Sequence, residues 1–128
     1  MDHAHKDIYE VKQLRLVICK NNGEAIGLID IFDFDFSNKR AGIGILINNV
    51  EDRGNGYGKE ALELLVNYCF KKLHLHQLYC NIAEDNTASL NLFKKAQFET
   101  IGLKKDWNLV GSSYKNEYFL QRINTDVH

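Results

Sequence analysis

The chain has 128 residues, a length typical of one domain, and 45% of them are hydrophobic, enough to form one sizeable core. Its 16 basic and 17 acidic residues give a formal net charge of −1, which argues against binding to nucleic acid or to an anionic membrane and favours a small partner. No apolar run approaches the ~20 residues of a membrane span, and the first residues lack the apolar core of a signal peptide, so a cytoplasmic location is expected.

The first half of the chain predicts three β-strands. Residues 14–19 form a short β-branched run, and the turn signal Asn21-Asn22-Gly23 joins them to a second strand that begins at residue 24. The second strand continues through residues 32–36, where phenylalanine alternates with aspartate. This alternation predicts three aromatic rings on one face and Asp33 and Asp35 on the other. Residues 40–47 then predict a third strand in the middle of a sheet.

A glycine-rich loop, Arg-Gly-Asn-Gly-Tyr-Gly at residues 53–58, follows the third strand. Glycine lets backbone N–H groups come close to a ligand, and the start of the helix that follows carries unpaired N–H groups and a partial positive charge. The loop therefore predicts an anion site of the kind that holds a pyrophosphate. It has neither the glycine order of a Rossmann fingerprint nor the Gly-Lys-Ser/Thr ending of a Walker A loop.

From Lys59 onward the hydrophobic period becomes helical. Residues 78–83 then predict a strand that pairs parallel to the third strand through a right-handed crossover. The apolar positions of the helix recur at spacings of three and four and are Leu62, Leu65, Val66, Cys69, Phe70 and Leu73.

The last part of the chain predicts a shorter helix and two strands. Asn86 or Thr87 caps this helix. The strands cover residues 97–103 and 114–122, and residues 107–113 form the connection, with the turn at Gly111.

The cysteines and histidines are interpreted as structural residues rather than as nucleophiles or metal ligands. The cysteines lie in apolar contexts without C-x-x-C spacing, and all three are expected to be buried free thiols: Cys19, Cys69 and Cys80. The histidine pairs at residues 3 and 5 and at residues 74 and 76 have no further ligands converging on them, so no metal site is expected.

Two segments resemble the signatures of the GNAT family of acetyl-CoA-dependent N-acetyltransferases. The glycine loop is similar to the family's Arg/Gln-x-x-Gly-x-Gly/Ala at Arg53, Gly56 and Gly58. Residues 86–98 are similar to the second signature, Asn-x-x-Ser/Ala-x-x-Leu-Tyr/Phe-x-Lys-x-Gly-Phe, and the matching residues are Asn86, Ser89, Leu92, Phe93, Lys95 and Phe98. The resemblance covers about residues 14–123 and is closest to the polyamine and ribosomal-protein N-terminal acetyltransferases. It implies one α/β domain over residues 1–128, with a mixed sheet in the GNAT acyl-CoA N-acyltransferase fold.

The resemblance implies that acetyl-CoA is the cofactor. The backbone of residues 45–47 would pair with the pantetheine, and residues 54–59 would hold the pyrophosphate, with Arg53 adding a cation beside it. Asn86 would bond the pantetheine arm, and Lys95 would reach the 3′-phosphate. The implied cofactor-binding residues are Ile45, Leu46, Ile47, Arg53, Gly54, Asn55, Gly56, Tyr57, Gly58, Lys59, Asn86, Ser89, Phe93 and Lys95.

The chemistry implied by the resemblance is direct attack of an amine on the thioester, with an acid that protonates the departing thiolate. Many members have a tyrosine as this acid at the place of Phe93, and phenylalanine has no proton to donate. Water, the helix field or another hydroxyl would have to substitute, and the candidate hydroxyls are those of Tyr57, Tyr79, Tyr114 and Tyr118.

Acidic residues are the candidates for the acceptor side. Glu84 is the first candidate for the general base, and Asp30, Asp33 and Asp35 are candidates for binding the amine, although each acid would also suit the polar edge of a sheet. Gly42 stands where related enzymes often carry a glutamate near the substrate.

The family normally begins with a strand and two helices that wall the acceptor site, and here only residues 1–13 precede the first predicted strand. A truncated chain, an open acceptor site or a partner subunit would each account for this. The expected activity is acetylation of a primary amine, with a polyamine or diamine favoured. A protein N-terminus, as on a ribosomal protein, is the alternative acceptor, and a CoA-binding module with impaired catalysis is the alternative function. The exposed strand edge and the phenylalanine-rich strand favour a homodimer.

Overall fold

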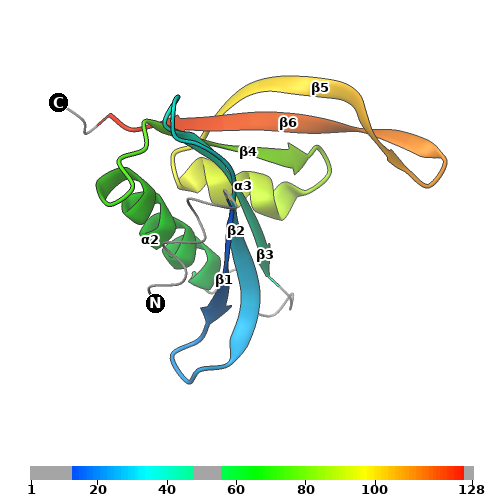
Figure 1. The fold of residues 1–128 in the computed structure, drawn as a ribbon. Coiled ribbons are helices and arrows are strands. Elements are labelled where there is room, and N and C mark those ends of the chain that lie inside the picture. Colours follow the sequence, from blue (N-terminus) through cyan, green and yellow to red (C-terminus); the bar gives the residue numbers. More distant parts are fainter. Residues whose placement is uncertain (1–12, 48–55, 126–128) are drawn as a thin grey trace.

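The computed structural model describes residues 13–47 and 56–125, which form one six-stranded sheet and two helices (Figure 1). The elements are β1 Leu14–Cys19, β2 Ala25–Asp35, β3 Arg40–Ile47, α2 Tyr57–Lys71, β4 Gln77–Ala83, α3 Thr87–Lys95, β5 Glu99–Val110 and β6 Ser113–Ile123. The third strand and both helices lie where the sequence predicts them.

The sheet is mixed, with the strand order β1-β2-β3-β4-β6-β5. β1, β2 and β3 pair antiparallel, and so do β4, β6 and β5. β3 and β4 are the parallel pair, and α2 lies in the crossover between them, as a strand–helix–strand unit requires. The predicted mixed α/β architecture is therefore confirmed.

One core lies on the side of the sheet that the helices cover. Alternate residues of the strands point into it, among them Ile29 and Ile31 of β2 and Leu78 and Cys80 of β4. The apolar stripe predicted for the first helix completes the packing, because its buried residues are Leu62, Leu65, Val66 and Cys69. We call the opposite side of the sheet the outer face.

The strict alternation predicted for residues 32–36 is wrong, because β2 has a bulge there. The register with β3 shifts between Phe32 and Asp35, and Asp33 adopts a left-handed φ of 51°. An extra residue in a strand reverses the side to which the following side chains point. Phe34 and Phe36 therefore stack on each other at 4.6 Å with Phe34 in the core, whereas Phe32 packs against Tyr79 of β4 at 6.2 Å.

The β5–β6 hairpin is longer than predicted. β5 continues to Val110 and β6 begins at Ser113, so residues 107–110 are strand rather than connection, and Gly111 lies in a tight turn. Figure 1 shows the hairpin projecting well beyond the helices. Its outer part therefore has no helix to pack against, and Trp107 and Leu109 are exposed.

The prediction of three buried thiols holds for two of them. Cys69 and Cys80 are buried, but Cys19 is exposed at the end of the edge strand β1. The helices described are too short and too polar for any of them to cross a membrane.

Candidate active site

The central feature of the candidate site is a fork between the two parallel strands. β3 and β4 pair only where residues 40–42 face residues 77–79, and Gly42 opposite Tyr79 is the last pair. Beyond this closed end, β3 remains paired with β2 as far as Ile47, and β4 remains paired with β6 as far as Ala83. Between Ile43 and Leu46 the edge of β3 that faces β4 therefore pairs with no strand among the described residues, and no third strand fills the opening there.

A cavity of about 430 Å³ lies beside the fork, bounded by three elements of the fold. β3 contributes the end of its strand, α2 its first turn and α3 one face. The lining residues are Ile45, Leu46, Ile47, Gly56, Gly58, Lys59, Asn86, Ala88, Ser89, Asn91, Leu92 and Lys95. Segments that are about 40 residues apart in the sequence are thus brought together around one space.

The N-terminus of α2 opens onto this cavity. Gly56 is the N-cap residue with a left-handed φ of 85°, a conformation that glycine adopts without a steric penalty. The first bond of the helix runs from the N–H of Glu60 to the carbonyl of Gly56, and Gly56 offers no side chain to cap the helix. The N–H groups of Gly58 and Lys59 precede this bond and therefore have no partner inside the helix. These groups and the positive end of the helix dipole suit an anion.

Asn86 has two roles available to it at the start of α3. Its side-chain oxygen accepts a hydrogen bond from the N–H of Ser89 at 3.2 Å, so it caps the helix. The same side chain lines the cavity, where its NH₂ group has no protein partner within the described ranges. The cap and a ligand contact are therefore compatible.

Sequence reasoning missed part of the α3 wall. Ala88, Asn91 and Leu92 line the cavity although no role was expected of them. They lie seven, four and three residues before Lys95, respectively, so all four share one face of the helix. This spacing was visible in the sequence, but which face of the helix meets the cavity depends on how α3 packs.

Two predicted cofactor contacts lie away from the cavity. Phe93 is 1% exposed and packs edge-on against Phe98 at 5.0 Å in the core, and Tyr57 packs against the same core. Neither is among the lining residues. The predicted contacts Arg53, Gly54 and Asn55 lie outside the described residues.

Glu84, the candidate base, lies just after the end of β4. The side-chain amide of Asn116 donates a hydrogen bond to its carboxylate at 2.9 Å, and the N–H of Glu84 bonds the carbonyl of Asn116. Glu84 is exposed and does not line the cavity.

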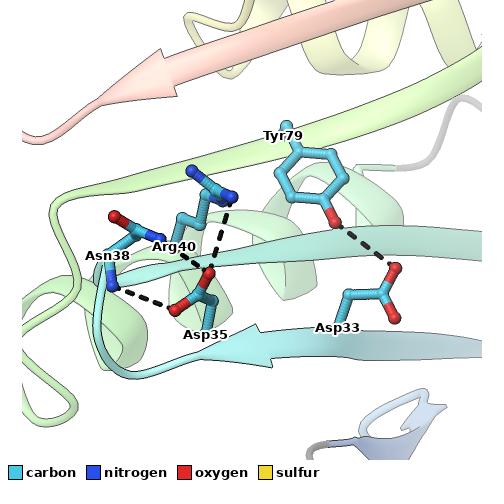
Figure 2. Close-up of polar contacts among 5 residues, drawn as sticks. All are labelled: Asp33, Asp35, Asn38, Arg40 and Tyr79. Carbon is cyan, nitrogen blue, oxygen red and sulfur yellow. Dashed lines mark hydrogen bonds and ion pairs between the residues drawn. The ribbon is translucent and has the colours of Figure 1, made fainter.

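The three aspartates of β2 have different surroundings. Asp30 forms an ion pair with Arg15 at 2.8 Å, and Asp35 is bonded by Asn38 and paired with Arg40 at 3.5 Å. Asp33 instead meets the hydroxyl of Tyr79 at 3.5 Å (Figure 2). The structure thus places these acids along one strand but leaves them with unequal access to a cationic ligand.

Tyr79 is the predicted proton-donor candidate that lies at the closed end of the fork. Burial raises the pKa of its phenol, and the negative charge of Asp33 raises it further, so the hydroxyl keeps its proton at neutral pH. Of the other candidates, Tyr114 is exposed on the projecting hairpin, and Tyr118 packs against the core.

The space at Gly42 is taken by the ring of Phe32. A Cβ at this glycine would lie 2.3 Å from the nearest ring carbon, far inside a normal contact. The chain therefore has no room for the side chain that related enzymes often carry here, because the ring of Phe32 from β2 lies against this glycine.

Comparison with known proteins agrees with this architecture. The family model of the acetyltransferase (GNAT) domain matches residues 1–99. The spermidine N(1)-acetyltransferase of Escherichia coli is 26% identical over 115 residues, which cover 90% of this chain and 61% of that protein. The N-acetyltransferase 9-like protein of Nematostella vectensis is 43% identical over 61 residues, 48% of this chain and 31% of that one.

Among solved structures, a single-residue mutant of the spermidine N-acetyltransferase from Vibrio cholerae has a TM-score of 0.82 at 20% identity, and the match covers 95% of this chain and 72% of that one. This chain thus spans about three fifths of the E. coli relative, and its fold is that of the V. cholerae enzyme. Since the family model covers more than three quarters of its length, the chain belongs to the GNAT acetyltransferase family.

Proposed function

We propose that this chain is a single catalytic domain that transfers the acetyl group of acetyl-CoA to a primary amine, with a diamine or polyamine as the favoured acceptor. The observation that carries the proposal is the fork itself. The edge of β3 between Ile43 and Leu46, which pairs with no described strand on the β4 side, and the N-terminus of α2 lie at the same cavity, and acetyl-CoA carries amides that can pair with this edge and phosphates that suit the helix.

The cavity suggests how the cofactor would lie. The pantetheine would run along residues 45–47 as an added strand, and the pyrophosphate would accept hydrogen bonds from the N–H groups of Gly58 and Lys59. Asn86 would donate its free NH₂ to the pantetheine arm, and Lys95 would face the 3′-phosphate from the other end of α3. Arg53 would add a cation beside the pyrophosphate.

The reaction would need no covalent enzyme intermediate. The neutral amine attacks the thioester carbon, the new C–N bond forms, the C–S bond breaks and CoA departs as a thiolate. We favour Tyr79 as the group that protonates the thiolate, because it lies at the closed end of the fork and holds its proton at neutral pH. Glu84 stays our candidate for the base, with water as the relay.

A polyamine acceptor is supported by the relatives whose names include spermidine acetyltransferase. A protein N-terminus is the alternative amine. The second candidate function is a CoA-binding domain without turnover, and the observation that favours it is Phe93, which occupies the usual place of the acid and is buried in the core.

Binding and turnover should be measured together. We expect acetyl-CoA to raise the midpoint of thermal unfolding, since ligand at 100 times its Kd stabilises a fold by about 2.7 kcal/mol, and we expect spermidine to trigger release of free CoA thiol. Ala88→Phe should abolish the stabilisation by filling the cavity, whereas Lys94→Phe, which puts the same ring on α3 outside the lining, should not. Stabilisation without thiol release on any amine would favour the domain without turnover. No stabilisation of the wild-type chain would contradict the cofactor proposal.

A further inference from the structure

The closed end of the fork is accessible from one side only. If the pyrophosphate lies at the start of α2 and the pantetheine runs back along β3, the acetyl group points to Gly42 and Tyr79. On the helix side this region is filled by core residues, among them Ile43, Cys80 and Phe93, each 1% exposed. An acceptor must therefore approach the thioester from the outer face.

Three partly exposed aromatic rings lie on the outer face around this point. Phe32 of β2 meets Tyr79 edge-on, with centroids 6.2 Å apart and planes at 90°. Phe119 of β6 stacks on Tyr79 at 5.6 Å and 24°. Rings in perpendicular and parallel orientations beside a carboxylate are the elements with which proteins hold an alkylammonium group.

The bulge in β2 provides the carboxylate. In a regular strand Asp33 would point to the same side as Ile31, which is buried in the core. The left-handed φ of Asp33 instead turns its side chain toward the hydroxyl of Tyr79, as Figure 2 shows. Bulges commonly redirect a side chain in this way beside active sites.

Asp33 also differs from Asp30 and Asp35 in whether a cationic side chain is paired with it. Arg15 neutralises Asp30, and Arg40 neutralises Asp35. Across the part of the chain that the structure describes, Asp33 has no cationic partner, and its polar contact is a neutral phenol that holds its proton. Of these three carboxylates, Asp33 is therefore the one whose charge is left for a ligand.

We propose that Asp33, together with the rings of Phe32 and Tyr79, forms the subsite for the non-reacting ammonium group of a diamine or polyamine acceptor. The proposal rests on the proposed acetyl transfer and names the part of the chain that selects the acceptor. In the free chain the hydroxyl of Tyr79 donates its hydrogen to the carboxylate and keeps it beside the rings. When the acceptor is bound, its ammonium group takes over the carboxylate, and its uncharged second nitrogen reaches the thioester in the fork.

The distance between the Asp33 subsite and the thioester position in the fork suggests the length of the acceptor. β2 lies about one and a half strand spacings from the middle of the fork, roughly 7 Å at 4.8 Å per spacing. Five single bonds of about 1.5 Å in an extended zigzag separate the nitrogens of a four-carbon diamine by roughly 6 Å. An aminobutyl group therefore fits the distance between subsite and fork.

The test compares 1,4-diaminobutane with butylamine, which has the same four-carbon chain but no second nitrogen. Release of CoA thiol is measured for the wild-type chain, for Asp33→Asn and for the control Glu24→Gln, an exposed acid in the β1–β2 turn. Asparagine tolerates the left-handed φ as well as aspartate does, so Asp33→Asn should fold normally, which thermal unfolding will verify. We expect Asp33→Asn to raise KM for diaminobutane roughly tenfold, the effect of about 1.4 kcal/mol of binding free energy, with no effect on KM for butylamine. The control Glu24→Gln should change KM for neither amine.

Two outcomes would overturn the proposal in different ways. If Asp33→Asn leaves KM for diaminobutane unchanged, or weakens butylamine to the same extent, the subsite is refuted while acetyl transfer stands. If acetyl-CoA stabilises the wild-type chain but none of the amines makes it release CoA thiol, the proposed transfer fails and this inference fails with it.

Discussion

Substituting Gly42 by alanine should test how the closed end of the fork is built. The added Cβ would lie 2.3, 2.6 and 2.8 Å from three carbons of the Phe32 ring. Carbon atoms in contact are normally about 3.5–4.0 Å apart, so the ring would have to retreat by more than 1 Å. Its retreat is limited because Tyr79 packs edge-on against it.

The expected cost follows from two opposing effects. Overpacking of a filled site destabilises a fold by about 1–3 kcal/mol. Replacement of glycine by alanine also removes conformational freedom from the unfolded chain, which stabilises by about 0.4–1 kcal/mol. Gly42→Ala should therefore lower the free energy of unfolding by roughly 1–2 kcal/mol, the difference between these terms.

A double-mutant cycle identifies the ring as the cause. Phe32→Val places a β-branched residue, which suits a strand, at this position and removes the three ring carbons that clash. In that background Gly42→Ala should become neutral or slightly stabilising, so the cost should change sign. Urea unfolding of the four proteins measures the coupling free energy. An equal cost of Gly42→Ala in both backgrounds would refute the view that Phe32 occupies the space at this glycine.

Three further predictions concern single side chains. Asn86→Ala should remove the helix cap, which lowers the free energy of unfolding by about 1 kcal/mol, and should also weaken acetyl-CoA binding. Asn86→Asp should keep the cap and weaken binding only. Unchanged affinity of the aspartate variant, measured by calorimetry, would contradict a ligand contact. At pH 8 a chromogenic disulfide reagent should react rapidly with one thiol of the native chain, that of the exposed Cys19, and with three after unfolding. Cys69 and Cys80 should react slowly in the native chain because burial raises the pKa of their thiols to about 12. Hydrogen bonds from Asn38 lower the pKa of Asp35 below its usual 3.8, so the stabilisation from this carboxylate is present above that pH and lost as the pH falls through its folded pKa. The thermal stability of the wild-type chain should therefore approach that of Asp35→Asn in acid. A difference between the two proteins that stays constant with pH would contradict this.

The periodic elements of the fold were predictable because local pattern decides them. A helix stripe such as that of α2 and a run of β-branched residues such as β3 must each bury one face, so their type and position can be read from the spacing of apolar residues. The glycine loop and the block at residues 86–98 likewise carry recognisable chemistry in their order, and the structure places their described parts around one cavity.

Tertiary contacts decided what the sequence pattern left open. The fork exists because pairing of β3 with β4 stops at Gly42, and no local signal marks where two distant strands separate. The bulge that turns Asp33 outward was hidden within a regular alternation, because a single left-handed residue changes the face of a strand without changing its composition. The sequence determined by itself the elements and the kind of ligand that a helix start accepts. Only the packing of β2 across β3 onto Tyr79 determined that Asp33 lies against this tyrosine and Phe32, since that arrangement depends on contacts between strands about 45 residues apart.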